Sequence, residues 1–283
     1  MDARRIEVQS VDDEVRLDSL LAREFELSRR YVRRLLASGR VRVNGVEAVK
    51  GTLLHPSDVV DVEPFRHPSE GPIAHLCFEP VLLSESGDLI AVDKPAGRAT
   101  HPLDYDETDT VLNAMLARFP EIRGVGEGGL MSGVAHRLDT QTSGVLVFAR
   151  SQRAWEHARR EFDSRSVDKL YRARVHGDFA AETESRLRLE HRGPRMRVVK
   201  RGGRESITRL RPVDSGSESS LVEARPVTGL MHQIRVALAE LGHPVVGDTL
   251  YGSSQRIERH WLHAVRIRIG EFSAESEPPP ELR

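Results

Sequence analysis

Apolar residues near the N-terminus recur with the spacing of short helices. Leu17, Leu20 and Leu21 predict one helix, and Ser28 is placed to cap a second helix that Gly39 ends. One side of the second helix is apolar and holds Tyr31, Val32, Leu35 and Leu36. The opposite side is basic and holds Arg29, Arg30, Arg33 and Arg34. The pattern therefore predicts an amphipathic helix with a strongly cationic outer face.

The segment that follows alternates polar and apolar residues and reads RVRVNGVEAV. Asn44 and Gly45 tolerate positive φ, so their place between the two halves predicts a hairpin. The basic helix face is ordinarily explained as a solvated surface. Four guanidinium groups without interleaved acids repel one another unless an anion is near, and RNA phosphate is the natural candidate.

These elements fall into a compact unit over residues 15–63, followed by the proline-containing segment PFRHPSEGPIAH at 64–75, which we interpret as a linker. Over residues 76–271, apolar runs such as LIAVDKP, VLVFA and SLVEARPV alternate with helical patterns. This alternation favours an α+β domain around a mixed or antiparallel sheet. Residues 272–283 contain SAESEPPPELR and have the composition of a disordered tail.

Composition places the chain among globular proteins that can bury a core, with 283 residues, 39% hydrophobic and 30% charged. No apolar run marks a secretory signal or a membrane segment, so we expect a cytoplasmic protein. The single Cys77 excludes an internal disulfide and offers no metal-ligand spacing. A net charge of −1 argues against nucleic-acid binding through bulk charge, which leaves local clusters to be considered.

The densest polar segment between apolar runs is HRLDTQTSG, residues 136–144, directly before the strand-like run VLVFA. Polar clusters at the mouth of a core strand often form sites. From spacing alone, Asp139 is better explained as a turn or cap residue bonded to Thr140 or Thr142.

Two further segments bear on Asp139. In LMHQIRVALAELG, Met231, Ile234, Leu238 and Leu241 form an apolar stripe, and Arg235 flanks it. A buried guanidinium needs a carboxylate, for which Asp139 is a candidate, although Arg235 can also extend to the surface. In the predicted strand DKLYRARVHG, Tyr171 lies on the apolar side, either as a core aromatic or in the wall of a pocket.

Two resemblances unite these segments. Residues 15–63 resemble the S4-type RNA-binding domain, a small α/β fold that implies an RNA partner and no chemistry. Most of residues 76–270 resembles the RluA-type family of pseudouridine synthases. The motifs that carry this resemblance are AVDKPAGRATHP, HRLDTQTSG, KLY, GRESIT, HQIR, GHPVVGDTLYG and WLHA. Departures from the family pattern are Leu230, where many members have arginine, and Ser206, where alanine is common.

The family resemblance implies roles for particular residues. Asp139 would be the catalytic carboxylate, Arg235 its partner, and Tyr171 the active-site tyrosine that stacks on uracil. Leu262 would close the apolar side of the pocket, and His136 and Arg137 would help to hold the flipped nucleotide. The reaction needs no cofactor and no metal.

The resemblance also implies the partner. RNA is the expected substrate, with large-subunit ribosomal RNA favoured by the linked S4-type module and transfer RNA as the alternative. A monomer is the default expectation. The rival hypotheses are a non-catalytic RNA-binding or ribosome-assembly factor and a hydrolytic N-glycosylase, which would release free uracil.

Overall fold

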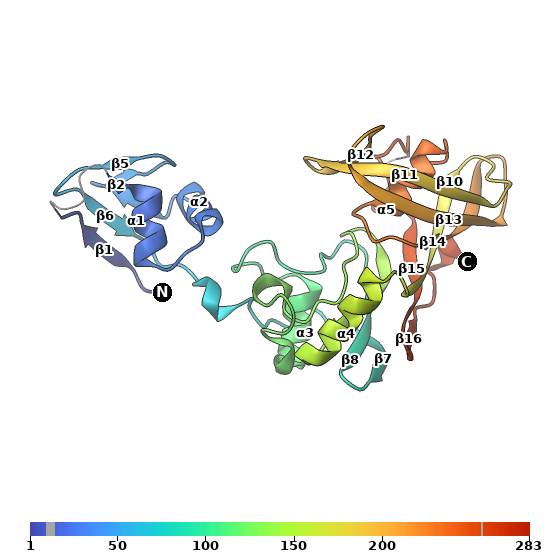
Figure 1. Cartoon of the computed structure of the whole chain (residues 1–283), viewed down its shortest axis with the longest axis horizontal. Coiled ribbons are helices and arrows are strands. Elements are labelled where there is room, and N and C mark those ends of the chain that lie inside the picture. The colour runs from blue at the N-terminus through green and yellow to red at the C-terminus, as the bar shows by residue number, and fades with distance from the viewer. Residues whose placement is uncertain (10–14, 256) are drawn as a thin grey trace. The chain divides into compact units, whose positions relative to one another are not determined.

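The computed structural model describes residues 1–9, 15–255 and 257–283. The chain divides into two compact units, residues 1–70 and residues 71–283 (Figure 1). The division falls inside the segment 64–75 that the sequence predicts as a linker.

The first unit combines two helices with a four-stranded antiparallel sheet. Its helices are α1 (Leu17–Glu24) and α2 (Arg29–Ala37), and a 3₁₀ turn, η1 (Pro68–Glu70), lies at its end. The order of strands in the sheet is β1 (Arg4–Glu7), β6 (Val59–Val62), β3 (Val41–Val43) and β4 (Val46–Glu47). A separate antiparallel pair consists of β2 (Val15–Arg16) and β5 (Leu53–Leu54).

Local chemistry accounts for the elements of this unit. The Ser28 hydroxyl accepts a hydrogen bond from the backbone N–H of Tyr31 at 3.2 Å and so caps α2. Gly39 follows the helix with φ +71°. Asn44 and Gly45 form the turn between β3 and β4 with φ of +51° and +79°, as a tight hairpin requires. The predicted helix cap and hairpin are confirmed.

The compact unit extends beyond the predicted residues 15–63 at both ends. β1 lies before residue 15 and pairs with β6, so the unit includes residues that the sequence analysis left out. At the other end, Phe65 is buried, and its ring centroid lies 5.3 Å from that of Phe25. The first part of the predicted linker therefore belongs to the core of this unit.

The second unit is built on one large mixed sheet, which confirms the α+β fold class. Its strand order along the sheet is β12-β11-β13-β14-β10-β15-β9-β8-β7, with β16 pairing β15 at the side of this path. All of these pairs are antiparallel except β9 with β15. The strands are β7 (Val81–Ser86), β8 (Leu89–Lys94), β9 (Ser143–Ala149), β10 (Asp168–His176), β11 (Thr183–Arg192), β12 (Arg195–Val198), β13 (Arg204–Asp214), β14 (Ser219–Pro226), β15 (Leu262–Ile269) and β16 (Phe272–Glu275).

Helices cover this sheet in two regions. Alternate residues of β8 and β9 pack against α3 (Val111–Arg118) and, on the other face, against α4 (Gln152–Asp163). All seven residues of β9 are buried as a result, which explains the continuous apolar run VLVFA. The other helix, α5 (Gln233–Glu240), packs against β10, β13 and β14 through Ile234 and Leu238. Short 3₁₀ turns are η2 (Pro120–Ile122), η3 (Gly129–Met131) and η4 (Pro280–Leu282).

The C-terminal segment is ordered, contrary to the predicted tail at residues 272–283. Phe272 and Ala274 of β16 are buried against the sheet. Arg174 Nε donates to the backbone oxygen of Glu281 at 2.8 Å, and Leu282 is fully buried. The prediction of disorder rested on the proline-rich composition. Composition does not show that a short strand pairs with β15 or that the chain end is anchored by contacts with distant residues. No described helix is long and apolar enough to cross a membrane.

Candidate active site

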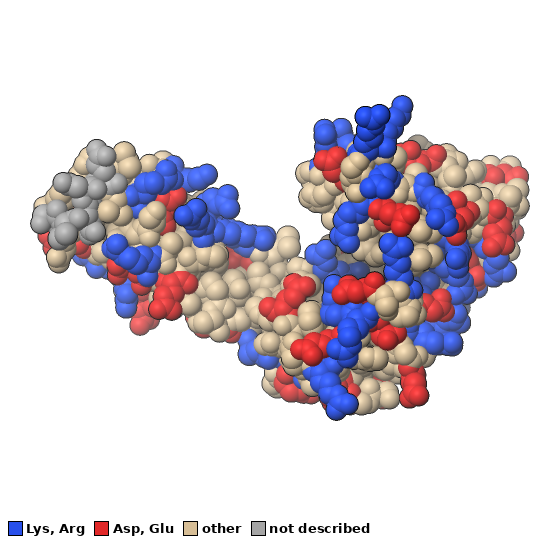
Figure 2. Space-filling view, in the orientation of Figure 1, with Lys and Arg blue, Asp and Glu red and all other residues tan. Residues whose placement is uncertain are grey.

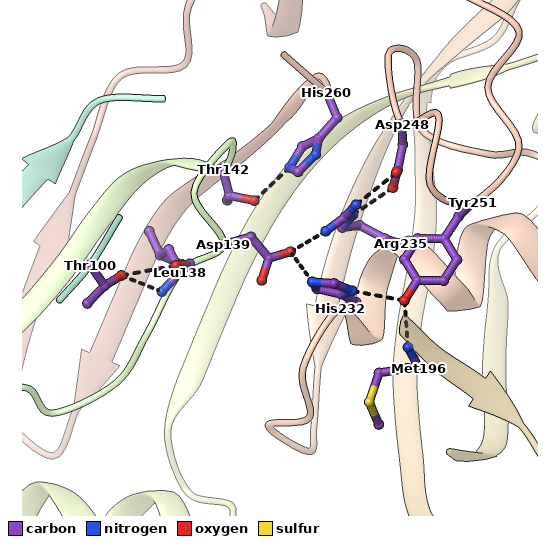
Figure 3. A network of polar contacts seen from close by, with 10 residues as sticks. All are labelled: Thr100, Leu138, Asp139, Thr142, Met196, His232, Arg235, Asp248, Tyr251 and His260. Atoms are coloured by element: carbon purple, nitrogen blue, oxygen red, sulfur yellow. Dashed lines mark hydrogen bonds and ion pairs between the residues drawn. The ribbon is translucent and has the colours of Figure 1, made fainter. Parts of the chain in front are cut away.

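Asp139 lies on the loop that leads into β9, and hydrogen bonds fix the backbone on both sides of it. The Thr100 hydroxyl donates to the backbone oxygen of Leu138 at 3.0 Å and accepts from its N–H at 3.2 Å (Figure 3). The backbone N–H of Thr142 donates to the backbone oxygen of Asp139 at 3.0 Å. Asp139 is therefore a turn residue, as the spacing indicated, and its carboxylate remains available for other contacts.

Lys94 supports the same loop from inside the protein. Its ammonium group donates to the backbone oxygens of Thr140 and Pro95, each at 2.9 Å, and its side chain is fully buried. Burial lowers the pKa of Lys94 to about 7, although the negative charge of Asp139 acts in the opposite direction. Lys94 comes from the motif AVDKPAGRATHP, so that motif holds the loop of Asp139 in place.

Arg235 joins Asp139 to a second carboxylate. Its Nη1 donates to Asp139 Oδ2 at 2.8 Å, while Nε and Nη2 donate to the two oxygens of Asp248 at 2.6 and 2.8 Å (Figure 3). The exposed fractions of these side chains are 8% for Arg235, 1% for Asp248 and 24% for Asp139. The bidentate bond to Asp248 holds the guanidinium rigidly. Of the two carboxylates bound to Arg235, only that of Asp139 reaches solvent to a substantial extent.

The two carboxylates also keep Arg235 charged. Burial by itself lowers the pKa of Arg235, but the hydrogen bonds and negative charges of Asp248 and Asp139 outweigh burial, so the pKa lies above its usual value. The permanently charged guanidinium makes a charge-assisted hydrogen bond to Asp139 and so orients its carboxylate.

His232 and Tyr251 complete this network. His232 precedes α5 with φ +53°, a strained backbone region for a residue with a side chain. Its Nδ1 lies 2.8 Å from the Tyr251 hydroxyl, and its Nε2 lies 3.7 Å from Asp139 Oδ2. The backbone N–H of Met196 already donates to the Tyr251 oxygen at 2.8 Å, which favours donation of the hydroxyl proton to Nδ1. The imidazole proton is then on Nε2, the atom that faces Asp139.

Tyr171 and Leu262 form an apolar wall near the carboxylate. Both pack in the cluster that includes Ile234 of α5, and Leu262 is buried. Tyr171 lies on β10 opposite Ala264 of β15, on the same face as Leu262. Burial raises the pKa of the Tyr171 phenol, and the charge of Asp139 raises it further. This tyrosine is therefore both a partly buried aromatic and a neighbour of Asp139.

Two histidines, one just before β15 and one near its start, brace the start of β9. The Thr142 hydroxyl lies 2.8 Å from His260 Nε2, and the Ser143 hydroxyl lies 2.8 Å from His263 Nδ1. Burial lowers the pKa of His260 to about 4, so this histidine is neutral at physiological pH. The motif WLHA thus supplies a brace in addition to the pocket residue Leu262.

His136 does not join the network around Asp139. Its Nε2 accepts a hydrogen bond from the backbone N–H of Val147 at 3.2 Å, and its ring lies 5.6 Å from that of Phe162. Burial lowers the pKa of His136 to about 3, so it is neutral. Arg137, by contrast, is exposed and forms no ion pair with any residue that the structure describes.

The cationic helix face of the first unit is present as predicted. Arg29, Arg30 and Arg33 are exposed, and Arg34 is half-buried. Figure 2 shows Lys and Arg side chains gathered over α2.

Residues of the site that the sequence analysis did not single out are Asp248, Tyr251 and His232. Asp248 and Tyr251 lie in GHPVVGDTLYG and His232 lies in HQIR, so the motifs contained them without a stated role. The predicted apolar stripe around Arg235 is wrong at both ends, since Met231 precedes α5 and Leu241 is 38% exposed. The helix is instead buried on most sides from Gln233 to Leu238.

Chemically, the site presents a partly exposed carboxylate on a fixed loop, beside an aromatic ring and an apolar side chain. Such a carboxylate can act as a nucleophile or stabilise a developing positive charge. Among the described residues, no group of three or more His, Cys, Asp or Glu side chains is placed to hold a metal ion.

Comparisons with known proteins bear on what this carboxylate does. A family model described as RNA pseudouridylate synthase matches residues 88–240, and one of the S4 domain matches residues 15–60. An uncharacterized RNA pseudouridine synthase of Mycobacterium bovis is 36% identical over 262 residues, which cover 88% of this chain and 84% of the relative. Ribosomal large subunit pseudouridine synthase D of Neisseria meningitidis serogroup B is 33% identical over 245 residues, covering 84% of this chain and 64% of the relative. The solved structure of human RNA pseudouridylate synthase domain containing 1 has a TM-score of 0.58 at 28% identity, covering 72% of this chain and 86% of that chain.

Proposed function

The chain belongs to the RluA-type family of RNA pseudouridine synthases, and from this premise we propose that it modifies uridines of large-subunit ribosomal RNA with Asp139 as the reacting carboxylate. The observation that carries the proposal is the bond between Asp139 and the buried Arg235, which is itself held by Asp248. This arrangement lies mainly within the segment that matches the synthase family.

The reaction is an isomerisation in which the atoms of the RNA balance. The bond between uracil N1 and ribose C1′ breaks, the base turns, and a bond forms between uracil C5 and the same C1′. The hydrogen on C5 leaves as a proton, and N1 gains a proton. The enzyme must therefore stabilise the separated base and ribose and provide for these proton transfers.

Asp139 would act on the separated base or ribose as a nucleophile or as a fixed negative charge. Either role requires an ionised carboxylate aimed at the substrate. Arg235 holds the carboxylate through its hydrogen bond, and Thr100 and Lys94 fix the loop that sets the direction of the carboxylate.

Tyr171 and Leu262 would receive the flipped uracil. Because the pKa of Tyr171 is raised, its phenol stays protonated at neutral pH. Tyr171 would thus act by stacking on the base and as a hydrogen-bond donor, rather than as a base in the resting enzyme. Leu262 supplies an apolar contact on the same face of the sheet.

His136 and Arg137 would take different roles from each other. Arg137 is exposed two residues before Asp139, where it would contact the RNA that the uridine leaves. His136 would support β9 from behind, since Val147 donates to its Nε2.

The choice of ribosomal RNA rests on the S4 domain and on the similarity to a relative named as a large-subunit synthase. Transfer RNA is the alternative substrate. The network around Asp139 is formed within one chain, which is consistent with a monomeric enzyme.

A pseudouridine map tests this proposal. Total RNA is mapped from cells with the wild-type protein, without it, and with Asp139→Asn as the only copy. We expect defined large-subunit sites to disappear in both the deletion and the variant, because asparagine keeps the shape of aspartate but not its charge. The exposed Asp214→Asn serves as the matched control and should retain every site.

The other outcomes discriminate between the alternatives. Loss of sites only in transfer RNA would replace the proposed substrate. Retention of all sites in the Asp139→Asn strain would refute the assignment of the carboxylate. Release of free uracil by the purified protein would indicate a hydrolase, since a synthase leaves the mass of the RNA unchanged.

A further inference from the structure

The hairpin of β11 and β12, with the turn that follows it, has a strong local positive charge. Residues 188–204 contain seven Lys and Arg residues and one Glu, in a chain with a net charge of −1. Six of these cations are exposed, and none forms an ion pair with a residue that the structure describes. They are Arg192, Arg195, Arg197, Lys200, Arg201 and Arg204. Figure 2 shows this concentration of Lys and Arg side chains over β12.

Arginines on neighbouring strands of the same sheet behave differently. Arg186 and Arg209 share Glu184 at 2.7 and 3.0 Å, and Arg211 pairs with Glu223 at 2.7 Å. The hairpin differs from the adjacent surface because its six exposed cations form no ion pair with a described residue, and Glu190, opposite Arg197 in the strand register, is its one acidic residue. Cations that are close together and unpaired form a site for an anion.

The turn that carries these cations is held in place. Arg188 donates to the backbone oxygens of Gly202 and Gly203 at 2.5 and 3.1 Å. Gly203 has φ +62°, and a Cβ there would lie 2.9 Å from the backbone oxygen of Leu189. The turn thus packs closely on β11, and a ligand that binds there would pay little to order it.

An open groove of about 460 Å³ lies between β12 with this turn and α5. Arg195, Arg197 and Lys200 line it, together with the acidic Glu240. The remaining lining is apolar or aromatic and consists of Met196, Val198, Val199, Val236, Ala239 and Tyr251. Cations beside apolar and aromatic surface match the phosphates, riboses and bases of a single RNA strand.

The groove shares a wall with the active site. Tyr251 lines the groove, and its hydroxyl is bonded to His232 and to the backbone N–H of Met196 (Figure 3). Its ring centroid lies 5.1 Å from the guanidinium carbon of Arg235, which holds Asp139. A strand in the groove would therefore contact Tyr251, whose ring also packs beside Arg235.

We propose that this groove binds the RNA strand next to the target uridine, with Arg195, Arg197 and Lys200 contacting its phosphates. The inference rests on the proposed function, since it names a second contact surface for the same RNA. The groove would position the strand, and Asp139 would act on the uridine flipped from it.

The test compares two double variants of the full-length enzyme that lose the same charge. Arg195→Gln/Arg197→Gln removes two groove cations, and Arg209→Gln/Arg211→Gln removes two exposed arginines of β13 that pair with acids. The substrate is unmodified large-subunit ribosomal RNA transcribed with tritium on uracil C5, so that each turnover releases tritium to water. Kd is measured on the same RNA at several salt concentrations.

We expect the groove variant to raise KM and Kd roughly tenfold and to change kcat by less than about twofold. The slope of log Kd against log salt should fall by about 1.4, because each contact with a single-strand phosphate contributes about 0.7. The control variant should resemble wild type in all of these quantities.

Equal KM and salt slope in the groove and control variants would overturn the proposal. A fall in kcat with KM and slope unchanged would also overturn it, because the arginines would then act on the chemistry and not on strand binding. If Arg195→Gln/Arg197→Gln unfolds at a lower temperature than wild type, Lys200→Gln/Arg201→Gln replaces it with the same criteria. Absence of tritium release by the wild-type enzyme would count against the proposed function alone, and the salt slope of Kd would still test the groove.

Discussion

At the scale of single residues, the site is organised around one guanidinium group that serves two carboxylates. Arg235 makes two hydrogen bonds to the buried Asp248 and one hydrogen bond to the partly exposed Asp139. The first contact fixes the guanidinium, and the second orients the carboxylate that we propose acts on the substrate. Replacement of Asp248 should therefore disturb Asp139 through Arg235, although Asp248 itself is buried away from the substrate.

Replacing Asp248 with asparagine tests this division of labour. Breaking a buried ion pair leaves an uncompensated charge, so Asp248→Asn should lower the free energy of unfolding by about 3 kcal/mol. Turnover should fall while the Kd for RNA stays within about twofold of wild type, because Asp248 is not exposed to the substrate. Urea unfolding and the tritium-release assay provide the two readouts.

Asp168 provides the matched control for that experiment. It also bonds two arginines, but its side chain is 39% exposed. Asp168→Asn should cost less than about 1 kcal/mol and leave turnover unchanged. Similar losses in both variants would show that burial of the pair does not matter.

The lowered pKa of His136 predicts how the free energy of unfolding depends on pH. Burial lowers its pKa to about 3, whereas the unfolded chain binds this proton near pH 6.5. Between these values the unfolded state holds more protons, so the free energy of unfolding falls as the pH falls. His136→Gln keeps an acceptor for the Val147 N–H but cannot titrate. Between pH 7 and pH 4.5, the free energy of unfolding of His136→Gln should fall by roughly 2 kcal/mol less than that of the wild type. Urea unfolding at each pH measures this difference.

The exposed His157 is the control for this pH effect. His157→Gln should follow the wild-type curve, since the substitution changes an exposed side chain and no buried group. If His136→Gln also follows that curve, the acid sensitivity must arise elsewhere in the fold.

At the scale of elements, the parallel contact between β9 and β15 brings the Asp139 loop to the rest of the site. Gly144 lies opposite Ala264 in this pair, one residue after the start of β9. Its φ is +106°, and an added Cβ would collide with the backbone oxygen of Ala264. Only glycine fits at this close approach of two backbones.

Gly144→Ala should accordingly destabilise the second unit by about 3 kcal/mol or more, through strain and steric conflict together. Turnover should fall as well, because the loop of Asp139 ends at the displaced strand. The control is Gly87→Ala, which has φ +56° but no atom within 4 Å of the added Cβ. It should cost only about 1 kcal/mol, and an equal cost for both variants would contradict the steric argument.

At the scale of the whole molecule, the chain combines a catalytic unit with a separate S4-type unit that carries its own exposed arginines. The acid-poor face of α2 has no part in the Asp139 network. Its contribution is therefore expected in RNA affinity and not in the chemical step.

Charge substitutions in the first unit test this expectation in the full-length chain. Arg29→Gln/Arg30→Gln/Arg33→Gln should weaken RNA binding and lower the salt slope of log Kd by up to about 2, with kcat unchanged. The control triple replaces Arg5, Arg16 and Arg42, each of which pairs with an acid. Equal salt slopes for the two triples would show that α2 does not contact the RNA.

The sequence by itself determined the features that depend on neighbours along the chain. The cap at Ser28, the Asn44–Gly45 hairpin, the amphipathic α2 and the buried strand β9 follow from turn chemistry and periodicity. The motifs also indicated the family, with Asp139, Tyr171 and Arg235 as its expected site residues.

Only the tertiary structure decided which of these residues meet. Asp139 and Arg235 are 96 positions apart, and their 2.8 Å contact depends on the order of strands in the sheet. The contact of Asp248 with Arg235 and the pairing of the C-terminal strand β16 with β15 also appear only in the tertiary structure. Local periodicity shows which face of an element is apolar, but the partner of that face is set by how distant segments pack, and no single segment contains that information.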